Sequence, residues 1–136
     1  MKIKVNKYWV VNLWEAIDGE TVEINFDVSK YIGLDISNDE DRDIIIRELL
    51  LPTVNYFSIE SREKIKYSLF YDSKYLSEEE LLELLNFFGG TVFNTPLPSM
   101  TCRGVYIKIG EKLFDNFSFD ELEFEEESDR NNYRLM

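Results

Sequence analysis

The sequence predicts an α+β fold, in which a largely antiparallel sheet carries two amphipathic helices on one face. Three observations lead to this prediction. Several stretches alternate apolar and polar residues with the two-residue period of a β-strand, an Asp-Gly pair separates the first two of them, and two Ser-x-x-Glu sequences precede apolar runs of helical length. The expected order of elements is ββαββαβ(β).

The first two strands are expected over residues 3–17 and 21–28, joined as a hairpin. Apolar side chains hold most odd positions of the first stretch and the even positions of the second. Asp18 and Gly19 supply the positive φ values of a type I′ turn. Pairing residue 17 with residue 20 puts both apolar sets on one face, which leaves Tyr8 and Trp14 on the other, either covered by a second layer or exposed as an interaction patch.

Two helices are expected after capping boxes. The first box is "SNDE" at Ser37–Glu40, followed by a helix through Leu51 that stops at Pro52. The second is "SEEE" at Ser77–Glu80, followed by a helix that Gly89-Gly90 ends.

The remaining strands complete the expected sheet. They are "VNYFSI" from residue 54, "KIKYSLFY" from residue 64, "VYIKI" at residues 105–109, and a final "KLFDNFSF". From residue 21 onward the order βαββαβ is similar to a ferredoxin-like split, to which the hairpin adds the long first strand. No linker divides the chain, so residues 1–136 are expected to form a single domain.

The charge of the chain is strongly acidic, with a formal net charge of −12. Residues 115–136 form an acidic C-terminal segment with eight acids against two arginines, a net of −6 in about a sixth of the length. Such a field repels nucleic acid and anionic lipid, so neither direct nucleic-acid binding nor membrane binding is expected. It attracts basic proteins, although acidic surfaces also serve solubility alone.

The chemistry that the chain lacks argues against an enzyme. It has no histidine, no Gly-x-Gly-x-x-Gly sequence and no phosphate-binding loop with its lysine, and its one cysteine, Cys102, has no nearby base. The run from Asp35 to Asp41 resembles a calcium loop, yet position six is Glu40 and position twelve is Ile46. We expect no catalytic residue, no cofactor and no metal. With one cysteine, no apolar leader and no membrane-spanning run, the sequence predicts a cytoplasmic protein.

The candidate binding residues lie in the acidic segment and on the second face of the first strand. Within the segment, aromatic residues alternate with acids, so either the aromatic side chains dock as an edge strand with the acids solvated, or the acids imitate a row of phosphates. The predicted partner-binding residues are Asp115, Asp120, Glu121, Glu123, Glu125, Glu126, Glu127, Asp129, Tyr8 and Trp14.

These features favour a non-enzymatic inhibitor that binds a basic, nucleic-acid-handling protein such as a nuclease or a nucleic-acid-binding effector. A toxin immunity protein or a phage-encoded antagonist of a bacterial defence, of the anti-CRISPR type, fits this description. One alternative is a small enzyme that uses a divalent metal, carboxylates and a lysine, for which "DSK" at Asp72–Lys74 is the best match. Another is a structural module that forms a homodimer or larger homo-oligomer.

Overall fold

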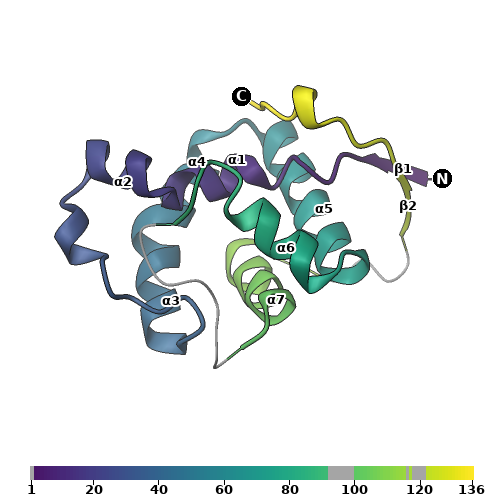
Figure 1. The fold of residues 1–136 in the computed structure, drawn as a ribbon. Helices are drawn as coiled ribbons and strands as arrows, with labels where there is room; N and C mark the ends of the chain where they lie inside the picture. Colours follow the sequence, from purple (N-terminus) through teal and green to yellow (C-terminus); the bar gives the residue numbers. More distant parts are fainter. Residues whose placement is uncertain (1, 92–99, 116, 118–121) are drawn as a thin grey trace.

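The computed structural model describes residues 2–91, 100–115, 117 and 122–136, and in these ranges the protein is mostly helical (Figure 1). The predicted α+β fold with a largely antiparallel sheet, the order ββαββαβ(β) and the ferredoxin-like arrangement are therefore wrong. The sheet found in the described ranges has two parallel strands. The elements in order are β1 (Lys2–Val5), α1 (Val11–Trp14), η1 (Glu15–Ile17), α2 (Gly19–Asn25), η2 (Val28–Lys30), α3 (Asp39–Ile45), η3 (Ile46–Leu50), α4 (Leu51–Tyr56), α5 (Ile59–Tyr75), α6 (Glu78–Leu85), α7 (Cys102–Leu113), β2 (Glu123–Glu126) and η4 (Arg130–Asn132).

The predicted first strand is a strand only over β1 and becomes helical from α1 onward. Val10, Leu13, Trp14 and Ile17 are all fully buried, and their spacing of three and four residues is that of a helix face. The same stretch also alternates apolar residues at odd positions, so two periods overlap in it. Of the large side chains that a strand would leave on its second face, Val10 and Trp14 are fully buried, and Tyr8 is half-buried.

The predicted hairpin turn at Asp18-Gly19 is absent. Asp18 is extended (φ −64°, ψ 137°) and precedes α2, and the Gly19 N–H donates to the Gly90 carbonyl at 3.0 Å. The predicted second strand is α2, in which Val22 is buried while Ile24 is 74% exposed. An Asp-Gly pair thus begins a helix here because its backbone pairs with a distant loop.

The strand predicted at residues 54–59 runs from α4 into the start of α5, and the strands predicted at 64–71 and 105–109 lie within α5 and α7. The last predicted strand, at 112–119, begins in α7, and its residues 116, 118 and 119 lie outside the described residues. In α5, Ile65 and Leu69 are one helical turn apart and fully buried, while Tyr67 and Tyr71 form a second row on the same helix. The alternating residues that suggested a strand are therefore divided between two rows along the surface of one helix. α7 packs on α5 and buries Val105, Tyr106 and Ile109, whereas Ile107 is exposed.

Both predicted helices exist, with different ends. Ser77 and Glu80 form the predicted capping box before α6. Before α3 the cap is Asn38, whose side chain accepts from the Asp41 N–H at 3.0 Å, rather than Ser37. Pro52 lies in the first turn of α4, directly after the π-helical turn η3, and the helical path continues to residue 56.

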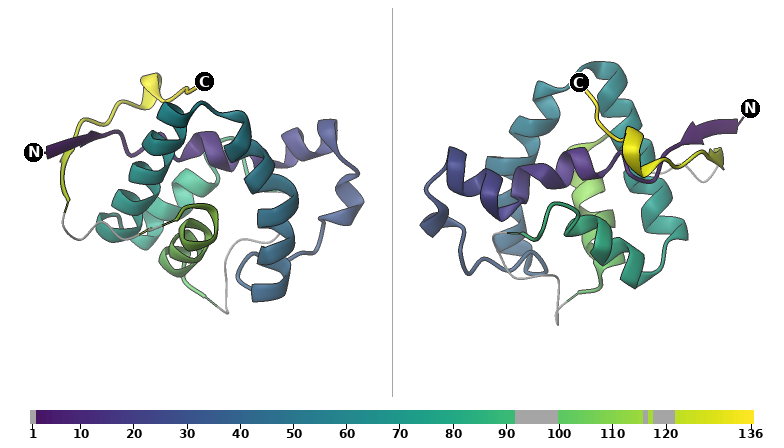
Figure 2. Two further views of the ribbon diagram at one scale, coloured as in Figure 1. Left: turned by 180° about the vertical axis from the view of Figure 1, so that it is seen from behind. Right: turned by 45° about the horizontal axis from the view of Figure 1, so that its top comes forward.

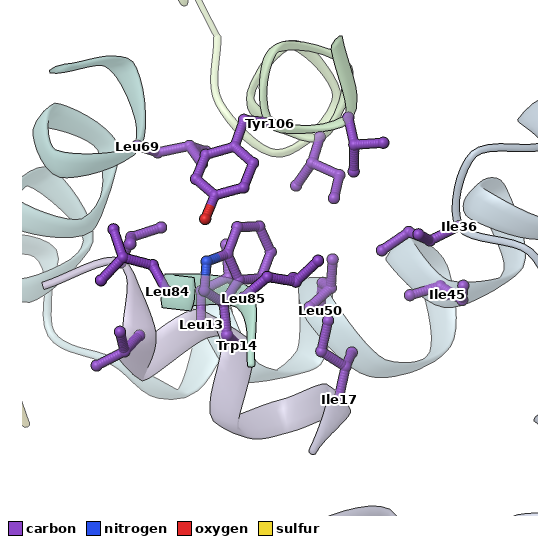
Figure 3. Close-up of a cluster of buried hydrophobic side chains, with 14 of the residues drawn as sticks. Leu13, Trp14, Ile17, Ile36, Ile45, Leu50, Leu69, Leu84, Leu85 and Tyr106 are labelled. Carbon is purple, nitrogen blue, oxygen red and sulfur yellow. The ribbon is translucent and has the colours of Figure 1, made fainter. Parts of the chain in front are cut away.

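The core lies among α1, α3, α5, α6 and α7 (Figure 3). Trp14 and Tyr106 meet at its centre, with ring centroids 5.1 Å apart, and the indole nitrogen points toward the tyrosine hydroxyl. That hydroxyl donates to the Leu81 carbonyl at 2.6 Å. The two largest core side chains therefore join α1, α6 and α7.

The strands lie at one end of the molecule and α2 at the other (Figure 2). Of the helices in the described ranges, none is both long and apolar enough to cross a lipid bilayer.

Candidate functional site

The C-terminal segment, residues 122–136, is attached to the other end of the chain by backbone pairing. β2 runs parallel to β1, with Lys2 beside Glu123 and Val5 beside Glu126, and the Glu127 N–H donates to the Val5 carbonyl at 2.8 Å. We call residues 2–5 and 122–136 together the terminal clasp.

Polar side chains of the helical body fix the rest of the segment. Each bond satisfies a backbone group of an otherwise irregular stretch, which holds that stretch in one path. The bonds run from Asn6 Nδ2 to the Asp129 and Asn132 carbonyls (3.0 and 3.3 Å), from Asn12 Nδ2 to the Tyr133 carbonyl (2.7 Å), and from the Leu135 N–H to Asn12 Oδ1 (3.1 Å).

The inner face of the clasp packs on α5. The Phe124 ring lies about 6 Å from the rings of Tyr67, Phe70 and Tyr71, measured between centroids. The Tyr71 hydroxyl donates to Glu126 Oε1 at 3.0 Å. Burial, together with this bond to a carboxylate, raises the pKa of Tyr71 to about 12. Glu126 is thereby turned toward the helix, although it belongs to the predicted binding set.

The outer side of the clasp carries the acids. Glu123, Glu125, Glu127 and Asp129 are all exposed and occupy alternate positions of the chain, the first two within β2, and we call them the acidic stripe. Alternate residues of a strand lie about 6.6–6.8 Å apart along its axis, whereas one strand of duplex DNA carries a charge per about 3.4 Å. The stripe therefore reaches about half the charge density of a DNA strand.

Two lysines of β1 lie beside the acidic stripe. Lys2 and Lys4 pair across the sheet with Glu123 and Glu125, and Lys4 Nζ lies 3.4 Å from Glu127 Oε1. Both members of that ion pair are more than half exposed, so the pair contributes little to stability, while the lysine charge offsets one of the four carboxylates of the stripe.

The remaining predicted acids are placed differently. Asp115 is exposed just after α7, while Asp120 and Glu121 lie outside the described residues. The acidic segment therefore contributes a continuous described surface only from residue 122 onward.

The two aromatic residues predicted to bind a partner, Tyr8 and Trp14, lie in different environments. Tyr8 is half-buried and lines a small groove of about 60 Å³ between α6 and the clasp, together with Lys7, Glu80 and Arg130. The Arg130 guanidinium lies 5.9 Å from the Tyr8 ring and 4.5 Å from that of Phe87. Trp14 is 0% exposed in the core, a position from which it reaches no partner without unfolding. The structure thus brings Tyr8, but not Trp14, next to the acidic segment.

The carboxylate proposed for metal chemistry is also buried. Asp72 is 0% exposed, and within the described structure neither of its carboxylate oxygens has a hydrogen-bond partner. Its neighbour Ser68 donates its hydroxyl proton to the Lys7 carbonyl instead. Burial raises the pKa of Asp72 well above its usual value. Among the described residues, no three potential ligands gather into a metal-binding group.

The two other motifs singled out in the sequence have structural roles. Asp35 Oδ1 accepts from the Ser37 N–H at 2.8 Å, which shapes the turn before α3. Cys102 is buried at the start of α7, where burial raises the pKa of its thiol to about 11. Its N–H donates to Glu78 Oε1 at 2.8 Å, so a glutamate of α6 caps α7.

Sequence reasoning missed the residues that hold the candidate site in place. Asn6 and Asn12 anchor the acidic segment across more than 120 residues of sequence. Asparagine carries no periodic or charge signal, and the only available hint was that a strand-like run contained two of them among apolar residues.

The chain matches no model of a known protein family, and neither a curated protein nor a solved structure matches it.

Proposed function

We propose that this protein is a non-enzymatic inhibitor that binds a basic, nucleic-acid-handling protein and occupies its cationic surface with the acidic stripe. A toxin immunity protein or an antagonist of a nuclease-based defence acts in this way. The observation that carries the proposal is the attachment of the acidic segment, since its acids stand exposed on a backbone that is bonded to β1 up to residue 127 and to Asn6 and Asn12 after it.

Fixed attachment matters because ordering a free segment on binding would subtract from affinity. In the clasp, backbone bonds and the Phe124 contacts already hold the acids in place. The stripe can therefore contribute its Coulomb energy to association without first losing chain entropy.

Charge also supports the choice of partner. The net charge of −12 steers a basic protein toward this molecule and repels nucleic acid from it. A stripe with about half the charge density of a single DNA strand suits a protein groove lined by separated lysines and arginines.

The test compares two variants with the same change in net charge. One is the stripe triple variant Glu123→Gln, Glu125→Gln, Glu127→Gln, and its control is Glu20→Gln, Glu23→Gln, Glu40→Gln on exposed positions toward the other end of the molecule (Figure 2). A pull-down from lysate at about 50 and 200 mM salt identifies the partner, and stopped-flow measurements give the association rate.

We expect the stripe variant to associate at least about tenfold more slowly than the control, with melting temperatures that agree. We also expect the wild-type rate to fall steeply with salt. Equal association rates for the two variants, or an association rate that does not change with salt concentration, would contradict the proposal. Loss of stability in the stripe variant with binding unchanged would make the acids structural.

A further inference from the structure

Within the described ranges, the sheet of the terminal clasp leaves one edge of β2 open. In a parallel pair, alternate residues of a strand turn their N–H and C=O groups toward the neighbour. The bond from the Glu127 N–H to the Val5 carbonyl, with Val5 beside Glu126, fixes this alternation. The N–H and C=O groups of residues 123, 125 and 127 point toward β1. The N–H and C=O groups of Phe124 and Glu126 therefore point to the opposite edge of β2.

Those backbone groups have no partner in the described ranges of the chain. β2 has one strand neighbour there, and no other backbone bond involves the N–H or C=O groups of Phe124 or Glu126. Two donors and two acceptors thus lie in a row on an extended strand, which is the arrangement that accepts an added strand.

We propose that the free edge of β2 binds an extended segment of the partner protein by strand addition, and that this segment carries lysine or arginine at alternate positions with apolar residues between them. This inference rests on the proposed function and specifies how the basic partner is recognised. The side chains of the added strand that share a face with Glu123 and Glu125 are the basic ones, and the others share the face of Phe124.

β1 itself shows the chemistry that complements β2. Its sequence Lys2-Ile-Lys-Val alternates basic and apolar residues, and it places Lys2 and Lys4 beside Glu123 and Glu125. The second edge of β2 presents the same outer row of carboxylates, so a strand of the same pattern satisfies it equally. Lys4 reaches only Glu127, which leaves the other two stripe acids of β2 without an ion pair within 4 Å in the described chain.

The same charges disfavour a second copy of this chain at that edge. Antiparallel pairing of two β2 edges would set the glutamates of one copy beside those of the other, and like charges opposite each other destabilise a sheet. The occupant that fits is therefore a basic strand from a different protein.

The first experiment uses a blocked eight-residue peptide of alternating lysine and valine as the probe. Its control is the same peptide with every backbone amide N-methylated, which keeps the charge and removes the strand donors. We expect the probe to slow hydrogen exchange of the Phe124 and Glu126 amides at least about tenfold, and the N-methylated peptide to bind at least about tenfold more weakly. Equal binding of the two peptides would overturn the proposal.

The second experiment blocks the edge on the protein. Glu126→Pro removes a donor that the β1–β2 ladder does not use, and proline is tolerated on an open edge. Its control, Glu126→Gln, keeps the N–H and removes the charge. We expect the proline variant to lose at least about tenfold in affinity for the probe while the control keeps most of it. Should the proline variant disturb the clasp, as judged by faster exchange of the Glu127 amide, the N-methylated peptide alone decides.

The outcomes separate this inference from the proposed function. Capture of a basic partner that depends on the acidic stripe, with unchanged exchange at Phe124 and Glu126, would overturn strand addition and leave the inhibitor proposal standing. Protection of both amides that rises with protein concentration, together with a doubled mass in light scattering, would assign the edge to a second copy and overturn it as well.

Discussion

Replacing Asp72 by asparagine is expected to stabilise the protein at neutral pH. The side chain is 0% exposed and unpaired in the described structure, and burial raises its pKa well above the usual value. Asparagine keeps the shape and cannot ionise. Each pKa unit of elevation corresponds to about 1.4 kcal/mol, and leaving a buried polar group unsatisfied costs about 1–3 kcal/mol, more for a charged one. We therefore expect a gain of about 1–3 kcal/mol near pH 8.

The pH dependence of this gain identifies its cause. A carboxyl group with a raised folded-state pKa contributes its full stability below the unfolded pKa, and that contribution is lost as the pH rises through the folded pKa. The advantage of Asp72→Asn should thus grow from pH 5.5 to pH 8. Urea denaturation at several pH values measures it, with Asp43→Asn on an exposed position of α3 as the control.

Two results would refute the reasoning. An advantage that stays constant with pH would mean that Asp72 does not change its protonation between the folded and unfolded states in this range. A variant less stable than the wild type at every pH would mean that the carboxyl group makes a favourable bond that asparagine cannot replace.

Two substitutions and one labelling experiment test other contacts. Gly110→Ala places a methyl group in collision with the Phe117 ring and should lower the free energy of unfolding by about 1–3 kcal/mol in urea denaturation; an unchanged value would contradict the packing of that ring on α7. Asn12→Ala removes the bonds that hold the C-terminal segment and should accelerate hydrogen exchange there, including at Leu135, but not in α5; uniform acceleration would contradict a local anchor. Cys102, with its pKa raised to about 11 from the reference value of 9.0, should react with a thiol reagent at pH 8 at least about 100-fold more slowly than in urea, and fast labelling of the native protein would contradict its burial.

The parts of the fold that sequence reasoning found are those with local signals. The Ser77–Glu80 box marks the start of α6 because a cap involves neighbours in sequence, whereas the helix ends at Leu85, before the predicted stop at Gly89-Gly90. The strands failed where periods of two and of three to four coexist, as at residues 10–17. There the choice depends on whether the rest of the chain covers all sides of the segment, and burial of both Val10 and Val11 shows that it does.

The candidate site was predictable in its charge and not in its construction. Glu123, Glu125 and Glu127 can be read from composition and spacing. The strand that supports them, β1, lies some 120 residues away in the sequence, and no local pattern indicates a parallel pairing across that separation. Trp14 was assigned to a binding face for the same reason, since the overlapping periods concealed a buried helix.

The pairing of β1 with β2 has a kinetic consequence. Closing a loop of about 120 residues carries a chain-entropy penalty of about 4 kcal/mol. The helices must therefore pack and bring β1 and β2 together before the hydrogen bonds between these strands can offset that penalty. The clasp should then be the last unit to form and the first to open. Because an opened clasp presents neither the stripe nor the strand edge in its fixed arrangement, a bound partner would slow that opening and protect the whole molecule against heat.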